Sequence, residues 1–239
     1  TEMELTANEG VSYRIAPWAY DLAENREYGP NTGEPQEADI PSGIGKVIIF
    51  DRTAPTAGIK VPKDIIPANG MRTLAAISGT AADVYSNFAV DIAIRKFSGT
   101  PLWYDGATFA VTGDDPNWLR ITGTNGFLSP DATSWIYAPA AMDDDFASGF
   151  NYLILVRSSD TAGNLQTQFT VGVSSMIIRI DKDRPVSVTA RPVDNGDGVS
   201  GRYKPGLIGQ TGNSTHLKGT AYDLPASTSS GVNTAQIRL

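Results

Sequence analysis

Aspartate is the residue type whose spacing in this chain best suits a chemical role. Asp51 opens the stretch "DRTAP", Asp83 closes "GTAAD", and Asp160 opens "DTAGN", which ends at Asn164. Carboxylate and amide oxygens are the ligands that hard cations such as calcium prefer. Carboxylates that a fold brings together also repel one another unless a cation screens or bridges them. These four residues are therefore candidate ligands, provided that the elements carrying them meet.

Each of the three stretches occurs twice in the chain. "DRTAP" is matched by "DKDRP", which begins at Asp181, and "GTAAD" is matched by "GTAYD", which ends at Asp223. "DTAGN" is matched by the earlier "DLAEN", which begins at Asp21. We call them the linker phrase, the strand-end phrase and the turn phrase, after the structure expected at each.

The three pairs of phrases have nearly the same spacing. The small differences come from insertions in segments rich in Gly, Pro and Asn, which surface loops tolerate. Three matches in the same order predict an internal repeat of about 130 to 140 residues.

Other acidic runs suit general acid–base chemistry on glycosides, which needs paired carboxylates. They occur at 114–115 and 143–145, and we expect both to be solvated turns. The chain has one histidine, His216, and no cysteine, so triads built on Ser/His or Cys/His have no spare members. We therefore expect no enzymatic activity.

The stretch "DNGDG" at 194–198 invites comparison with a calcium-binding EF-hand loop. The loop register would place Val193 at the first ligand position and Lys204 at the twelfth, where an acidic residue is required. We therefore interpret 194–198 as a turn.

Charge and hydropathy exclude two classes of partner. The net charge is −7 and the sequence pI is about 4.7. Binding to nucleic acid depends on Lys and Arg that displace counterions from phosphates, so we expect no nucleic-acid partner. No apolar run reaches the roughly 18 residues that a transmembrane helix needs, so we expect no membrane span.

Short segments of alternating polarity, separated by turns rich in Gly, Pro, Asp and Asn, predict β-strands throughout. The expected strands cover 56–61, 73–81, 89–97, 108–113, 119–123, 134–139, 150–159 and 166–180. Several antiparallel strands in about 130 residues favour a β-sandwich. Trp103, Trp118 and Trp135 are expected to pack in its core or at strand ends.

The quoted phrases, together with "WYDG" and the aromatic strand before "DTAGN", resemble the bacterial Ig-like (Big-type) tandem repeats of large cell-surface and adhesin proteins. The resemblance implies an all-β fold of tandem Ig-like β-sandwich repeats, one complete and two partial. Residues 51–180 would form the complete repeat, 1–50 the last strands of a preceding repeat, and 181–239 the first strands of a following one. Glu24 departs from the pattern, which has Gly at this position of the turn.

The resemblance also implies where the aspartates meet. In an Ig-like sandwich the start of the first strand, the loop after the second strand and the last hairpin turn lie at one pole. A calcium ion at each junction between repeats is therefore a candidate cofactor. The expected ligands are Asp51, Asp83, Asp160, Asn164, Asp181 and Asp223. The alternative is that each aspartate only caps its own turn.

We expect a non-catalytic, mechanical role outside the cell or on its surface, as a stalk, adhesin shaft, sheath or filament element. The first alternative is a glycan- or protein-binding module that uses the loops near Asp114 and Asp143, and the second is an accessory domain of an enzyme. The partners would be neighbouring repeats of the same or an adjacent chain. We favour a segment of a longer tandem array over head-to-tail self-assembly, in which one copy completes the partial repeat of the next.

Overall fold

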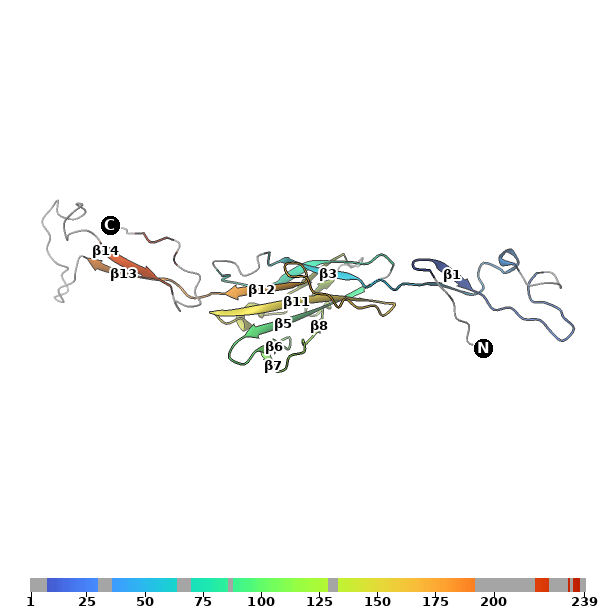
Figure 1. Cartoon of the computed structure of the whole chain (residues 1–239), viewed down its shortest axis with the longest axis horizontal. Helices are drawn as coiled ribbons and strands as arrows, with labels where there is room; N and C mark the ends of the chain where they lie inside the picture. The colour runs from blue at the N-terminus through green and yellow to red at the C-terminus, as the bar shows by residue number, and fades with distance from the viewer. Residues whose placement is uncertain are drawn as a thin grey trace.

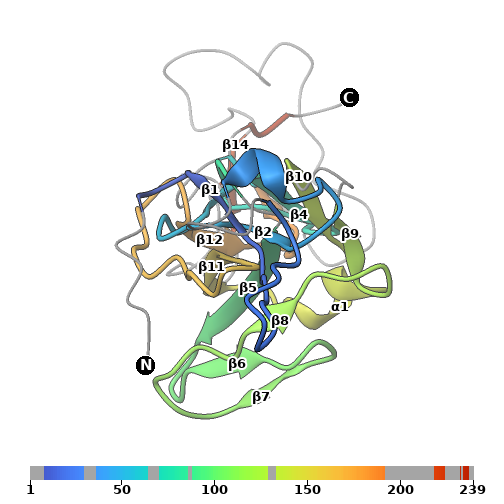
Figure 2. The same ribbon diagram turned by 90° about the vertical axis from the view of Figure 1, so that its right-hand side faces the viewer.

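The structure, a computed structural model, describes residues 8–29, 36–63, 70–85, 88–128, 133–191, 218–223, 232 and 234–236. Its strands form three groups in a row (Figure 1). An N-terminal hairpin lies at one end, a C-terminal hairpin at the other, and a larger middle unit lies between them. Figure 2 looks along this row from the end where the N-terminal hairpin lies.

The middle unit is built from two antiparallel sheets. The first has the order β3-β4-β10-β9, and the second has the order β12-β11-β5-β6-β7, with β8 also paired to β5. Their strands are β3 (Thr56–Val61), β4 (Ile77–Ala82), β5 (Phe88–Phe97), β6 (Leu102–Tyr104), β7 (Phe109–Val111), β8 (Leu119–Arg120), β9 (Gly126–Leu128), β10 (Ser134–Tyr137), β11 (Phe150–Asp160) and β12 (Ser175–Ile180). The fold is therefore all-β, as the sequence predicts. One α-helical turn, α1 (Met142–Asp145), precedes β11.

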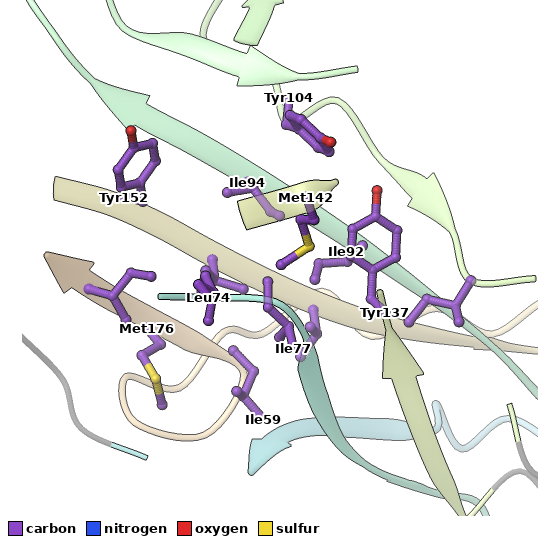
Figure 3. Packing of buried hydrophobic residues seen from close by; sticks show 14 of the residues in the cluster. Ile59, Leu74, Ile77, Ile92, Ile94, Tyr104, Tyr137, Met142, Tyr152 and Met176 are labelled. Carbon is purple, nitrogen blue, oxygen red and sulfur yellow. The ribbon is translucent and has the colours of Figure 1, made fainter. Parts of the chain in front are cut away.

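The core lies between the two sheets, because alternate side chains of each strand point inward. In β12 the buried residues are Met176, Ile178 and Ile180, which alternate with half-buried neighbours. Ile59 and Ile77 of the first sheet join the same cluster as Ile92 and Ile94 of the second (Figure 3). Burying such side chains stabilises the fold by roughly 1.5–3 kcal/mol each.

Trp103 and Trp135 are both almost completely buried, which confirms the expectation for these two residues. Trp135 lies in the main core, whereas Trp103 lies in a smaller cluster with Ala93 and Leu155. Trp118 packs against this smaller cluster and is half-buried.

The expected strand at 166–180 is correct only for its second part, since β12 begins at Ser175. Within 166–174 the chain satisfies the outer edge of β3 without forming a strand. The side-chain oxygen of Gln166 accepts a hydrogen bond from the Ala57 N–H at 2.7 Å, and the Val173 carbonyl accepts one from the Ile59 N–H, also at 2.7 Å. The acidic run at 143–145 lies in α1 and is not a loop.

Each hairpin at the ends of the row contributes two antiparallel strands. The N-terminal hairpin consists of β1 (Ser12–Ile15) and β2 (Lys46–Ile49), with a short 3-10 helix (Glu37–Asp39) between them. The C-terminal hairpin consists of β13 (Val186–Arg191) and β14 (Lys218–Tyr222). No helix among the described residues is long and apolar enough to cross a membrane.

The C-terminal hairpin has the same pairing register as β3 and β4. Thr56 pairs with Ala82, and their counterparts in the repeat, Val186 and Tyr222, pair with each other. Every remaining pair of residues also matches. Residues of β3 and β13 correspond at the spacing of the linker phrases, and residues of β4 and β14 correspond at the spacing of the strand-end phrases. The irregularity recurs as well, after Ile59 in β3 and after Thr189 in β13.

The N-terminal hairpin repeats the pairing of β11 with β12 in the same way. Tyr13 pairs with Ile48, and their counterparts Tyr152 and Ile178 pair with each other. All four pairs of the N-terminal hairpin match. Residues of β1 and β11 correspond at the spacing of the turn phrases, and residues of β2 and β12 correspond at the spacing of the linker phrases. The repeated phrases in the sequence therefore coincide with repeated hydrogen-bonded structure.

Candidate metal centre between the N-terminal hairpin and the middle unit

Three aspartates meet at the pole of the middle unit that faces the N-terminal hairpin. Asp51 lies in the linker before β3, Asp83 directly follows β4, and Asp160 is the last residue of β11. Antiparallel pairing places the start of β3 beside the end of β4, since Thr56 lies opposite Ala82. One carboxylate oxygen from each of the three aspartates lies within 4.8 Å of the others, and all three residues are half-buried.

Two of these carboxylates are oriented by their own turns. The Thr53 N–H donates to Oδ1 of Asp51 at 3.1 Å, and the Tyr85 N–H donates to Oδ1 of Asp83 at 3.0 Å. Both bonds reach the backbone two residues ahead, which is the Asx-turn that aspartate favours. In Asp51 and in Asp83, the Asx-turn hydrogen bond is accepted by one carboxylate oxygen, Oδ1.

Asp160 is held by the residue that closes its turn. Its Oδ1 accepts the Asn164 N–H and its Oδ2 accepts the Asn164 side-chain amide, both at 2.7 Å. Burial alone raises the pKa of Asp160, but the hydrogen bonds from Asn164 and the turn outweigh burial and lower the pKa below its usual value. Asp160 is therefore ionised at neutral pH.

Asn164 also joins the turn to the linker, because its side-chain amide donates to the Asp51 carbonyl at 3.0 Å. This amide nitrogen therefore bridges Asp51 and Asp160, two of the three clustered residues. In this structure Asn164 acts as a positioning residue that brings the linker to the pole.

The chemistry of the cluster favours a divalent cation. Three carboxylates this close repel one another in the absence of a positive charge. In addition, Oδ2 of Asp83 is buried and has no hydrogen-bond partner among the described residues. A buried carboxylate oxygen without a partner is costly, and coordination to a cation would satisfy it. The residues present therefore fit a calcium ion held by Asp51, Asp83 and Asp160.

The expected ligands at the second junction occupy equivalent positions. Asp181 and Asp223 are 7% and 6% exposed, so both are more buried than their counterparts Asp51 and Asp83. The Asp183 N–H donates to Oδ1 of Asp181 at 3.2 Å, which reproduces the turn at Asp51. Asp181 therefore precedes β13 and Asp223 follows β14, as Asp51 precedes β3 and Asp83 follows β4.

A second feature of both junctions is absent from the sequence-based predictions. The Glu9 carboxylate accepts the Arg52 N–H at 3.0 Å, and the Ser148 hydroxyl accepts the Lys182 N–H at 2.8 Å. We call this contact the junction latch. Each latch acceptor precedes a glycine of positive φ, and the stretches "EGVSY" and "SGFNY" that contain them have the same spacing as the two turn phrases. That shared spacing is the signal that reveals the latch.

The aspartates near the alternative binding site make hydrogen bonds or ion pairs with other parts of the chain. Oδ1 of Asp143 accepts the Leu74 N–H at 2.5 Å, and its Oδ2 pairs with the Lys182 ammonium at 3.3 Å. Asp145 accepts the buried Tyr104 hydroxyl at 2.7 Å. The side chain of Asp114 is fully exposed and pairs with Arg95 at 3.2 Å. His216 and the stretch 194–198 lie outside the described residues.

No family model, curated protein or solved structure matches this chain.

Proposed function

We propose that this chain is a non-catalytic structural segment of an extracellular or cell-surface protein built from tandem Ig-like sandwich repeats. Residues 51–180 form the complete repeat in this proposal, and 1–50 and 181–239 are parts of its two neighbours. The chain's role is to transmit load and set length, as in a stalk, adhesin shaft, sheath or filament. In arrays of this kind each repeat contacts its neighbours, and length grows with the number of repeats.

The recurrence of registers in both hairpins is the observation that carries this proposal. The hairpin β13–β14 matches β3–β4 pair by pair, including the irregularity, and β1–β2 matches β11–β12. The turn repeats as well, since the Asp21 N–H and the Asp160 N–H each donate at 3.0 Å to the carbonyl four residues on. Chance similarity does not preserve pairing, turn and spacing together.

The path of the chain through the middle unit suits a load-bearing role. The linker enters at the pole where Asp51 and Asp160 meet. The chain leaves from the end of β12, where Ile180 pairs with Phe150, the first residue of β11. These two points lie at opposite ends of β11, so tension between them acts along the strands. Ladder hydrogen bonds are perpendicular to the strands and therefore break together under such tension.

The aspartate cluster extends this proposal to the junctions. A calcium ion on Asp51, Asp83 and Asp160 would tie the linker to two loops of the middle unit. The ion would hold the start of the repeat at its pole, beside the latch that connects it to the preceding repeat. Asp181 and Asp223 would contribute to the equivalent ion of the next junction.

Single-molecule force spectroscopy on the chain, tethered at both ends, tests the mechanical role. We expect one cooperative rupture that releases residues 51–180, a length of roughly 45 nm at about 3.5 Å per residue. Extension without a cooperative rupture would contradict the proposal, because a load-bearing repeat must resist force as a unit.

A further inference from the structure

The outer edge of β14 in the C-terminal hairpin has a counterpart in the middle unit that is paired with another strand. In the middle unit β4 lies between β3 and β10. Its register-matched counterpart β14 pairs with β13 in a two-stranded sheet of the described residues. The edge of β14 that faces away from β13 therefore corresponds to the edge of β4 that binds β10.

The occupant of the β4 edge is defined by one aromatic contact. Trp135 of β10 lies opposite Gly79, and its indole N–H donates to the Thr80 carbonyl at 3.2 Å. A Cβ atom on Gly79 would clash with the Trp135 ring, so glycine is required beneath the indole. Tyr137, two residues on, is completely buried, whereas Ile136 between them is 41% exposed.

The β14 strand reproduces the acceptor half of this contact. Gly219 stands at the position of Gly79, and Thr220 stands at the position of Thr80. A Cβ atom on Gly219 would clash with the Val188 carbonyl, as one on Gly79 would with the carbonyl of the matching β3 residue. Gly219 and Thr220 are both exposed. The β13 and β14 backbones thus approach each other closely at Gly219, as the β3 and β4 backbones do at Gly79. The position that corresponds to the Trp135 indole is exposed to solvent.

We propose that the edge of β14 is an acceptor site for an extended peptide segment that carries a tryptophan opposite Gly219 and a second aromatic residue two positions later. The main-chain groups of β14 supply the ladder hydrogen bonds, and Gly219 supplies the selectivity for an indole. Unpaired strand edges favour such additions. This site stands on the register match alone, so it holds whether or not the chain bears load.

Direct binding of a short peptide to the full chain tests the site. The probe is a labelled synthetic peptide, TSWIYAP, with the sequence of residues 133–139. We expect saturable binding by fluorescence anisotropy and amide NMR shifts at Gly219, Thr220 and neighbouring β14 residues. A peptide with alanine in place of the tryptophan should bind at least about tenfold more weakly, since buried aromatic anchors dominate such contacts. A peptide with alanine in place of the isoleucine should keep its affinity, because that side chain points outward.

Three results would overturn the proposal. The first is the absence of binding, the second is equal binding of the tryptophan and alanine peptides, and the third is amide shifts confined to β4 and β9, which would indicate exchange with β10. Gly219→Val should abolish binding and Thr220→Val should preserve it. Gly219→Val can also disrupt the pairing of β13 with β14. The comparison of the peptide variants is therefore the measurement that decides whether the site exists. None of these results depends on the force measurement, so the two proposals fail separately.

Discussion

Tyr13 and Tyr152 make the same contact in two different parts of the chain. Each hydroxyl accepts a hydrogen bond from the backbone N–H five residues earlier, at 3.0 Å from Asn8 and at 2.8 Å from Ala147. The two tyrosines also occupy the same position in their hairpins, since each pairs with the matching isoleucine of the partner strand. They differ in burial, because Tyr152 is enclosed by the middle unit and Tyr13 is half-buried.

Removing the hydroxyl should therefore cost more in the middle unit. Tyr152→Phe leaves the Ala147 N–H without its acceptor, and we expect the free energy of unfolding to fall by about 1–2 kcal/mol. Tyr13→Phe should change it by a few tenths of a kcal/mol at most, because water replaces the hydroxyl at a more open site. Urea unfolding curves of both variants measure the difference, and equal losses would contradict it.

Calcium should stabilise the chain through the aspartate cluster. A ligand present at about 100 times its dissociation constant stabilises the folded state by about 2.7 kcal/mol. For a domain of this size the expected increase in Tm is roughly 5–10 °C. The measurement is thermal unfolding in calcium and in EDTA. Asp83→Asn should abolish the increase, and Asp115→Asn, an exposed aspartate in a loop, should keep it. Identical Tm values in calcium and EDTA would rule out the ion.

The turn at Glu24 should be strained where its counterpart is relaxed. Glu24 has φ 65° and Gly163, at the same place in the repeat, has φ 95°. Left-handed backbone costs a non-glycine residue roughly 1–2 kcal/mol. We expect Glu24→Gly to slow hydrogen exchange in the turn at 20–26. Gly163→Ala should destabilise the middle unit by about 1 kcal/mol, through backbone strain alone, because a Cβ there meets no atom within 4 Å. Unchanged stability in Gly163→Ala would contradict this account.

Acid should weaken the turn at Asp160. Its pKa is lower in the folded state than in the unfolded state, where a value near 3.9 is usual. The ionised side chain therefore contributes stability above about pH 4, and this contribution is lost as the pH falls through the folded pKa. In EDTA, the difference in Tm between the parent chain and Asp160→Asn should shrink on acidification from pH 6 to pH 3. Asp114→Asn, whose side chain is fully exposed, is the control. A constant difference across this range would exclude Asp160 as the titrating group.

Alternating polarity predicted the strands best where one face of the strand is buried. Thr56–Val61 was predicted at its observed bounds, and the alternation in Ser175–Ile180 matches its burial. Phe169, Val171 and Val173 alternate equally well but are 37%, 70% and 51% exposed. The pattern failed there because the Gln166 side chain and the Val173 carbonyl already satisfy the β3 backbone.

The candidate site was more predictable than the details of its junction. Repetition identified Asp51, Asp83 and Asp160, and the structure brings all three together. The latch was missed because its two acceptors, Glu9 and Ser148, differ in residue type, although they accept the same backbone bond. A sequence comparison detects matching residue types. This contact requires only a side-chain oxygen at the right position, which residues of different types can supply.

In the proposed tandem array, the junction latch would allow one repeat to be exchanged for another. The linker contributes a main-chain N–H to each latch, from Arg52 in one case and Lys182 in the other, so this bond does not depend on the type of the linker side chain. A repeat excised at the linker and inserted elsewhere in such an array would form the same latch hydrogen bond with its new neighbour. Duplicating, deleting or reordering such repeats would change the length of the protein without requiring a new contact between repeats.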